Sequence, residues 1–119
     1  NVFRKKILEI YSDTCCITGL NIPQLNRASH IIPWSERKDI RLDPSNGLCL
    51  SATYDVAFDQ HLISLDEDYR LIISGKIKEA YTKKAVKDYF NSIEGQKIKL
   101  PKAYLPKRGY LEVHRKHLV

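Results

Sequence analysis

Apolar residues recur three or four positions apart at both ends of the chain. In the first eleven residues this spacing aligns Phe3, Ile7, Leu8 and Tyr11. A helix over 2–11 would place all of them on one face. The same period predicts a second amphipathic helix over 78–91. A last helix is predicted over 108–117, after an extended stretch bracketed by Pro101 and Pro106.

Between these helices the apolar runs are short and bounded by turn residues, which is typical of strands. Strands are predicted over 13–18 and 27–32, and a hairpin over 62–74 turns at Asp66-Glu67-Asp68. Ser51 is a favourable N-cap, so a short helix is predicted over 52–60. A long loop is expected between the strand over 27–32 and this helix. The layout therefore mixes helices and strands.

Length and composition indicate one globular domain. The chain has 119 residues, 43% of them hydrophobic and 29% charged, and these values argue against disorder. No apolar run approaches the roughly 18 residues that span a bilayer, and no signal peptide opens the chain. Because the sequence starts at Asn1 and lacks methionine, we expect residues 1–119 to be a single domain from a longer protein that carries a separate recognition domain.

The cysteines argue against a disulfide framework, because their number is odd and two are adjacent. They also cannot supply the four thiolates of a zinc site, so no structural zinc is expected. Free thiols suit a reducing cytoplasm. Cys15, Cys16 and Cys49 are therefore predicted to be small core residues.

Charge is distributed unevenly along the chain. The net charge is +6, but residues 1–75 carry −2 and residues 76–119 carry +8. Lysine and arginine contact phosphates without selecting a sequence, so the basic half favours a polyanionic partner. An ordinary solvated surface is the alternative.

A histidine and an asparagine stand at positions suited to chemistry. His30 lies just before Pro33, where the predicted strand ends, and a neutral imidazole can take a proton from water near pH 7. Asn46 lies in the turn Asp43-Pro44-Ser45-Asn46-Gly47, where its amide could hold the histidine strand. For each residue taken singly there is an alternative: His30 could be a purely structural histidine, and Asn46 could be a simple turn residue.

Two carboxylates follow on the predicted helix. Asp55 and Asp59 are four residues apart, so they share a face and repel each other. A bound cation between the two carboxylates would turn this repulsion into a stabilising arrangement. A solvated acidic face is the alternative.

Together these residues resemble the HNH endonuclease family, whose core is a β-hairpin followed by one helix around a metal (the ββα-metal fold). The likeness is to a branch often found as the C-terminal module of bacterial restriction-type proteins. It implies an α+β fold with its core at about 13–62, an N-terminal helix, an added β-hairpin and C-terminal helices. The segments that carry it are 3–11, 16–19, 28–31, 46–50, 58–64 and 100–114.

The resemblance implies a role for each matched residue. His30 matches the general base that activates water, and Asn46 matches the structural asparagine. Asp55 matches the metal ligand on the helix, and Asp59 lies at a second ligand position. The residue before the base is often Asp or His and supplies a ligand. Ser29 is a weaker donor, so the metal is expected to rely on the two aspartates, water and phosphate.

The implied reaction is hydrolysis of phosphodiester bonds in double-stranded DNA with one divalent cation. Oxygen ligands favour Mg²⁺ or Mn²⁺, and the cation would stabilise the leaving oxygen. Cutting both strands with one site per chain would need a homodimer or two binding events. Trp34 is expected to be a core residue. Candidate DNA contacts are Arg37, Arg41, His61, Lys83, Lys84, Lys87, Lys107, Arg108, Arg115 and Lys116.

Three classes of function are compatible with these features: an active DNA endonuclease, a catalytically inactive DNA-binding module on the same fold, and a protein-interaction module. Ser29 is the feature that favours the second class. The joint presence of His30, Asn46 and Asp55 favours the first, because decayed sites usually lose the base or the metal ligand. Salt-dependent binding to duplex DNA would separate the second class from the third.

Overall fold

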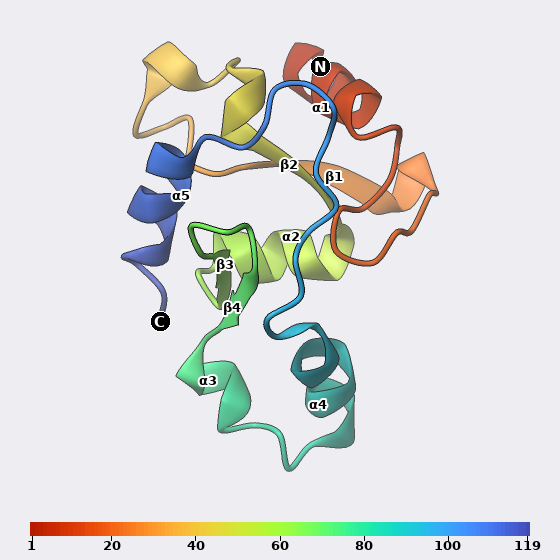
Figure 1. Ribbon diagram of the computed structural model, residues 1–119, viewed down its shortest axis with the longest axis vertical. Helices are drawn as coiled ribbons and strands as arrows, with labels where there is room; N and C mark the ends of the chain where they lie inside the picture. The colour runs from red at the N-terminus through yellow and green to blue at the C-terminus, as the bar shows by residue number, and fades with distance from the viewer.

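A β-hairpin between two helices forms the centre of the computed structural model, which describes all residues, 1–119 (Figure 1). Strands β1 (Asn26–His30) and β2 (Gly47–Ser51) are antiparallel, with His30 opposite Gly47. Helix α1 (Val2–Ile10) packs against one face of the hairpin and α2 (Ala52–Asp59) against the other. The hairpin followed by α2 is a ββα unit, and the predicted α+β fold is confirmed.

The second half of the chain adds a smaller hairpin and three helices. Strand β3 (Ile63–Leu65) pairs with β4 (Leu71–Ile73) in a separate antiparallel sheet. The helices are α3 (Gly75–Lys78), α4 (Lys84–Phe90) and α5 (Arg108–Arg115), and α5 packs on β3. Between α4 and α5 the chain runs back alongside α1 (Figure 1). No helix combines the length and hydrophobicity needed to cross a membrane.

One apolar core joins α1, the central hairpin and α2. Ile7, Leu48 and Phe58 are each no more than 1% exposed. Fully burying a side chain of this size contributes about 1.5–3 kcal/mol to stability. The three cysteines are buried free thiols, as predicted: Cys15, Cys16 and Cys49.

Gly47 permits the close approach of α1 to the hairpin. A Cβ atom at this position would lie 2.5 Å from Cδ1 of Ile7 and 2.7 Å from Cζ of Phe3. Any other residue would therefore force the buried Ile7 and Phe3 side chains to shift. The absence of a side chain at this position allows the present close packing of α1 on the hairpin.

Five predicted elements are confirmed to within a few residues: the helix over 2–11, the strand over 27–32, the helix over 52–60, the hairpin over 62–74 and the last helix over 108–117. The strand predicted over 13–18 is wrong. Ser12 and Asp13 have φ values of 53° and 59°, so the chain turns sharply there. The hairpin partner of β1 is instead β2, in the segment expected to be a loop. Four of its five residues are buried, so no alternation marks it in the sequence.

The single helix predicted over 78–91 is also wrong, because the structure has α3 and α4 in its place. Ser74 starts the earlier helix by accepting a hydrogen bond from the Lys76 N–H (3.1 Å). Lys83 is extended, with φ −88° and ψ 118°, and separates the two helices. Thr82, a weak helix former, lies at the break.

Candidate active site

Strand β1 directs successive side chains to opposite faces of the hairpin. Ser29 is buried, and its hydroxyl donates a hydrogen bond to Oδ1 of Asp55 on α2. His30 faces α1, where its ring stacks on Phe3 with centroids 3.8 Å apart and planes 8° from parallel. The imidazole and the Ser29–Asp55 pair therefore lie on opposite faces of one strand.

The His30 ring is oriented by two contacts. One is the stack on Phe3, and the other joins Nε2 to the carbonyl oxygen of Arg41 at 2.8 Å. A carbonyl oxygen only accepts, so Nε2 must carry a proton and donate it. In the neutral ring Nδ1 is then the nitrogen with a free lone pair. The site thus leaves one defined atom that can accept a proton.

Asn46 holds the backbone that follows His30. Its side chain is fully buried, and Oδ1 accepts from the Ile32 N–H (2.9 Å) while Nδ2 donates to the Ile32 carbonyl (3.0 Å). Its own backbone carbonyl accepts from the Ile31 N–H (3.0 Å). The amide therefore continues the ladder of hydrogen bonds beyond the end of β1 and fixes where the histidine strand leaves the sheet.

The oxygen donors near α2 are few. Asp55 is partly buried beside Ser29, and Asp59 is exposed at the last residue of the helix. No group of three His, Cys, Asp or Glu side chains comes together in the structure to hold a metal. A cage built wholly from protein is therefore not available here. One or two carboxylates with a hydroxyl do fit a cation that keeps most of its water, which is how Mg²⁺ is usually bound.

The predicted phosphate contacts do not form one surface. Arg41 lies beside His30, whereas Arg37 is paired with Asp39 through hydrogen bonds of 2.9 and 2.8 Å. Lys83 and Lys87 lie at α4, at the opposite end of the molecule from the loop after β1 (Figure 1). Of these predicted contacts, Arg41 is the one that is hydrogen-bonded to His30, through its backbone carbonyl, and its side chain lines the same pocket.

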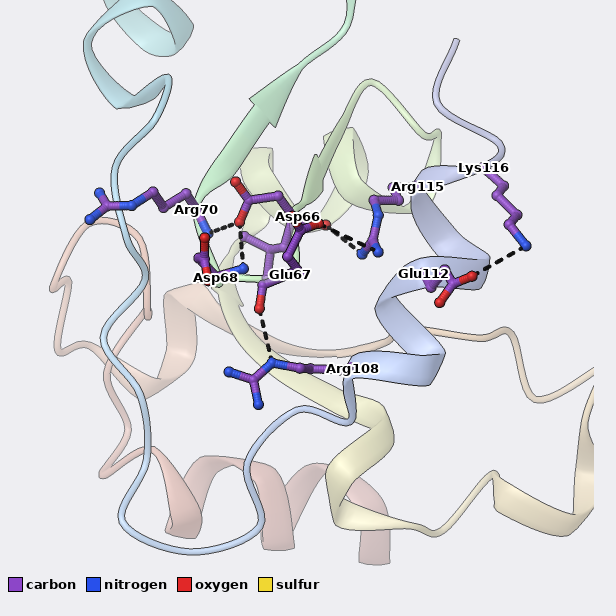
Figure 2. A network of polar contacts seen from close by, with 9 residues as sticks. Asp66, Glu67, Asp68, Arg70, Arg108, Glu112, Arg115 and Lys116 are labelled. Carbon is purple, nitrogen blue, oxygen red and sulfur yellow. Dashed lines mark hydrogen bonds and ion pairs between the residues drawn. The ribbon is translucent and has the colours of Figure 1, made fainter.

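The basic groups of α5 are partly neutralised within the domain (Figure 2). Arg108 donates to the Glu67 carbonyl at 2.9 Å, and Arg115 lies 3.9 Å from the Glu67 carboxylate. Lys116 pairs with Glu112 at 3.5 Å, and the Lys107 amine lies over the Tyr110 ring. Exposed pairs of this kind contribute little to stability, so a phosphate could displace them.

Trp34 is not the core residue that the sequence led us to expect. Its side chain is 50% exposed, with the Arg41 guanidinium 5.7 Å from the ring centroid. The chain has left the sheet by Pro33, and the Trp34 side chain projects from the loop rather than into the core.

A histidine cluster at the end of α2 was not foreseen in the sequence. His114 of α5 stacks between Phe58 (3.7 Å) and His61 (4.3 Å). Its Nδ1 is 2.7 Å from Oγ of Ser64, and its Nε2 is 2.8 Å from the Phe58 carbonyl. His61 is therefore part of the contact that fastens α5 to α2. The spacing of Leu111 and His114 on one helix face was the available signal.

The buried His114 makes stability depend on pH. Burial lowers its pKa to about 4, against a weaker opposing effect of the Phe58 carbonyl hydrogen bond. In the unfolded chain this histidine takes up a proton near pH 6.5, whereas in the folded chain it does so only near pH 4. The free energy of unfolding is therefore highest above pH 6.5 and decreases as the pH falls from 6.5 towards 4. The expected slope is at most about 1.4 kcal/mol per pH unit, or about 3 kcal/mol in total.

Urea unfolding at a series of pH values would measure this slope, with His114→Gln as the test variant and His117→Gln as the exposed control. Loss of the slope in His114→Gln alone is expected. Equal slopes in all three proteins would show that His114 is not responsible.

Part of the chain matches a known protein family. Residues 15–66 match the model of a family described as HNH endonuclease. The resemblance to that family is therefore confirmed over the hairpin, the loop within it and α2.

A solved structure extends the likeness to the whole fold. It is titled "Modification dependent TagI restriction endonuclease", and it is similar over 98% of this chain with a TM-score of 0.71 and 16% sequence identity. At this identity the likeness concerns the fold alone. The chain spans 37% of the length of that protein. No curated protein matches the chain.

Proposed function

We propose that this domain is a metal-dependent endonuclease that hydrolyses DNA phosphodiester bonds, with His30 as the general base. The observation that carries the proposal is the placement of His30 and the Ser29–Asp55 pair on opposite faces of β1. Displacement at a phosphate needs the attacking and leaving oxygens roughly in line. A phosphate at the end of β1 would have the base on one side and the carboxylate on the other.

His30 supplies the proton transfer. Nδ1 accepts a proton from the attacking water. Nε2 keeps its own proton, which it donates in a hydrogen bond to the Arg41 carbonyl oxygen. Phe3 prevents the ring from turning away. Asn46 acts at a distance from the reacting atoms, because it holds the backbone that fixes the position of the histidine.

Asp55, with Ser29 and with Asp59 as a second carboxylate, would hold one divalent cation, Mg²⁺ or Mn²⁺ by the preference of oxygen donors. When bound, this ion supplies Lewis-acid stabilisation of the leaving oxygen. The second carboxylate oxygen of Asp55, Oδ2, would be the one to bind the ion, because the Ser29 hydroxyl is hydrogen-bonded only to Oδ1.

We propose that the partner is double-stranded DNA. Arg41 would contact a phosphate beside His30, with Arg37 and His61 near the same loop and Lys83, Lys87, Lys107 and Arg108 as more distant contacts. Such contacts carry little sequence information, so a recognition domain outside these residues would select the target. Cleavage of both strands would require a homodimer or two successive binding events.

One observation favours a second candidate, a catalytically inactive DNA-binding module on the same fold. Ser29 stands where an acidic or histidine ligand is common in the family, and its hydroxyl is engaged with Asp55. This candidate predicts salt-dependent duplex binding without nicking in any divalent metal.

Metal dependence is the direct test of the enzyme. We expect supercoiled plasmid to be nicked with Mg²⁺ or Mn²⁺ and to stay intact with EDTA. Asp55→Ala should slow nicking by about 10²-fold or more, because a metal supplies several kcal/mol of transition-state stabilisation. Asp88→Ala is the matched control, an exposed aspartate of α4 paired with Lys84. Nicking that survives EDTA and Asp55→Ala would contradict the proposal, and duplex binding without nicking would support the inactive module.

A further inference from the structure

A pocket of about 240 Å³ opens next to the proposed base. It is lined by Asn1, Phe3, His30, Trp34, Arg41 and Leu42. Two of these are large apolar side chains left in water: Trp34 is 50% exposed and Leu42 is 58% exposed. The pocket thus combines an accessible aromatic ring with the histidine that we propose to act on the phosphate.

Arg41 contacts both the proposed base and the exposed aromatic ring of the pocket. Its backbone carbonyl accepts the hydrogen bond from His30, and its guanidinium lies over the Trp34 ring. No salt bridge engages this guanidinium, in contrast to Arg37. It can therefore contact a phosphate while the ring beneath it contacts the attached nucleoside.

We propose that this pocket binds an unpaired nucleobase of the DNA strand next to the cleaved phosphate, with the base stacked on Trp34. The inference rests on the proposed function. An exposed aromatic ring beside an arginine is the combination that binds single-stranded nucleic acid, because every base has a face that can stack. In a paired duplex both faces of a base are covered by its neighbours, so only an unpaired or displaced base can lie on the ring.

The pocket therefore narrows the substrate class. Phosphates beside unpaired nucleotides, as in single strands, frayed ends or mismatches, should be bound more tightly than those within a fully paired helix. The carboxylates of Glu36, Asp39 and Asp43 in the same loop do not line the pocket, so none of them would face the bound nucleotide there.

Trp34 is the only tryptophan of the chain, so its fluorescence reports directly on the pocket. We would titrate the protein in EDTA, which should prevent cleavage, with single-stranded oligothymidylate and with a long, blunt-ended duplex that is fully paired. The single strand should quench the emission, and the paired duplex should leave it nearly unchanged. Fluorescence anisotropy of labelled DNA would measure binding in parallel.

Variants sharpen the test. Trp34→Ala should weaken single-strand binding by about 5- to 150-fold, the range expected for the loss of one stacked base. Trp34→Phe should recover part of the loss. Tyr104→Ala is the matched control, because Tyr104 is 49% exposed beneath a lysine amine but lines a different groove. Circular dichroism would verify that each variant is folded.

The outcomes separate the subsite from the nuclease. Single-strand binding with unchanged emission, or Trp34→Ala binding as tightly as wild type, would overturn the subsite even if plasmid nicking persists. Equal quenching by single strand and paired duplex would overturn the requirement for an unpaired base. Quenching by the single strand in a protein that never nicks would support the subsite on an inactive DNA-binding module.

Discussion

Replacing His30 with alanine should reduce metal-dependent nicking by about 10²- to 10⁴-fold, the usual contribution of a general base. His30 is the only histidine that lines the pocket beside Trp34, so the variant leaves no imidazole there to accept the proton. The rate should be measured on supercoiled plasmid under conditions where the wild-type protein is saturated with metal.

His117→Ala provides the comparison, because His117 is exposed near the end of the chain and lies outside the pocket of His30. It should nick at the wild-type rate. A His30→Ala protein with unchanged metal affinity and unchanged nicking would remove His30 from the mechanism and leave the role of base unassigned.

Replacing Asn46 with alanine should cost about 2–6 kcal/mol of folding free energy. The substitution leaves the Ile32 N–H and carbonyl without their partners, and each unpaired buried group costs about 1–3 kcal/mol. A small domain has only about 5–15 kcal/mol of stability, so the variant should lie near the limit of folding. Urea unfolding followed by circular dichroism would measure the change.

Asn91→Ala is the matched control, since Asn91 is exposed just beyond α4. Its effect should be within about 0.5 kcal/mol of zero. If Asn46→Ala were equally mild, the two hydrogen bonds to Ile32 would have to be replaced by water, and the asparagine would not be the brace that the geometry indicates.

The sequence was informative wherever a side chain acts through its immediate neighbours in the chain. Asn46 sits in a turn of recognisable composition, and the spacing of Asp55 from Ser51 placed it in the first turn of a short helix. These short-range patterns were enough to predict where α2 starts and that Asp55 and Asp59 both lie on it.

The sequence was much less informative about contacts between distant segments. β2 is buried on both faces and so shows no alternation of polar and apolar residues. The bond between Ser29 and Asp55 and the stack of Phe3 on His30 depend on the direction in which each strand residue faces, and that direction follows from the register of the hairpin. Nothing local to Trp34 distinguishes a buried ring from one that projects out of a loop.

The stack of Phe3 on His30 also bears on the modularity of this domain. The stretch that matches the family model, residues 15–66, begins after α1, yet the ring that stacks on the histidine belongs to the third residue of the chain. The hairpin and α2 transplanted alone into another scaffold would bring His30 and Asp55 without the Phe3 ring that stacks on the histidine. A portable version of this site must include α1, together with a glycine at position 47 that lets the helix dock.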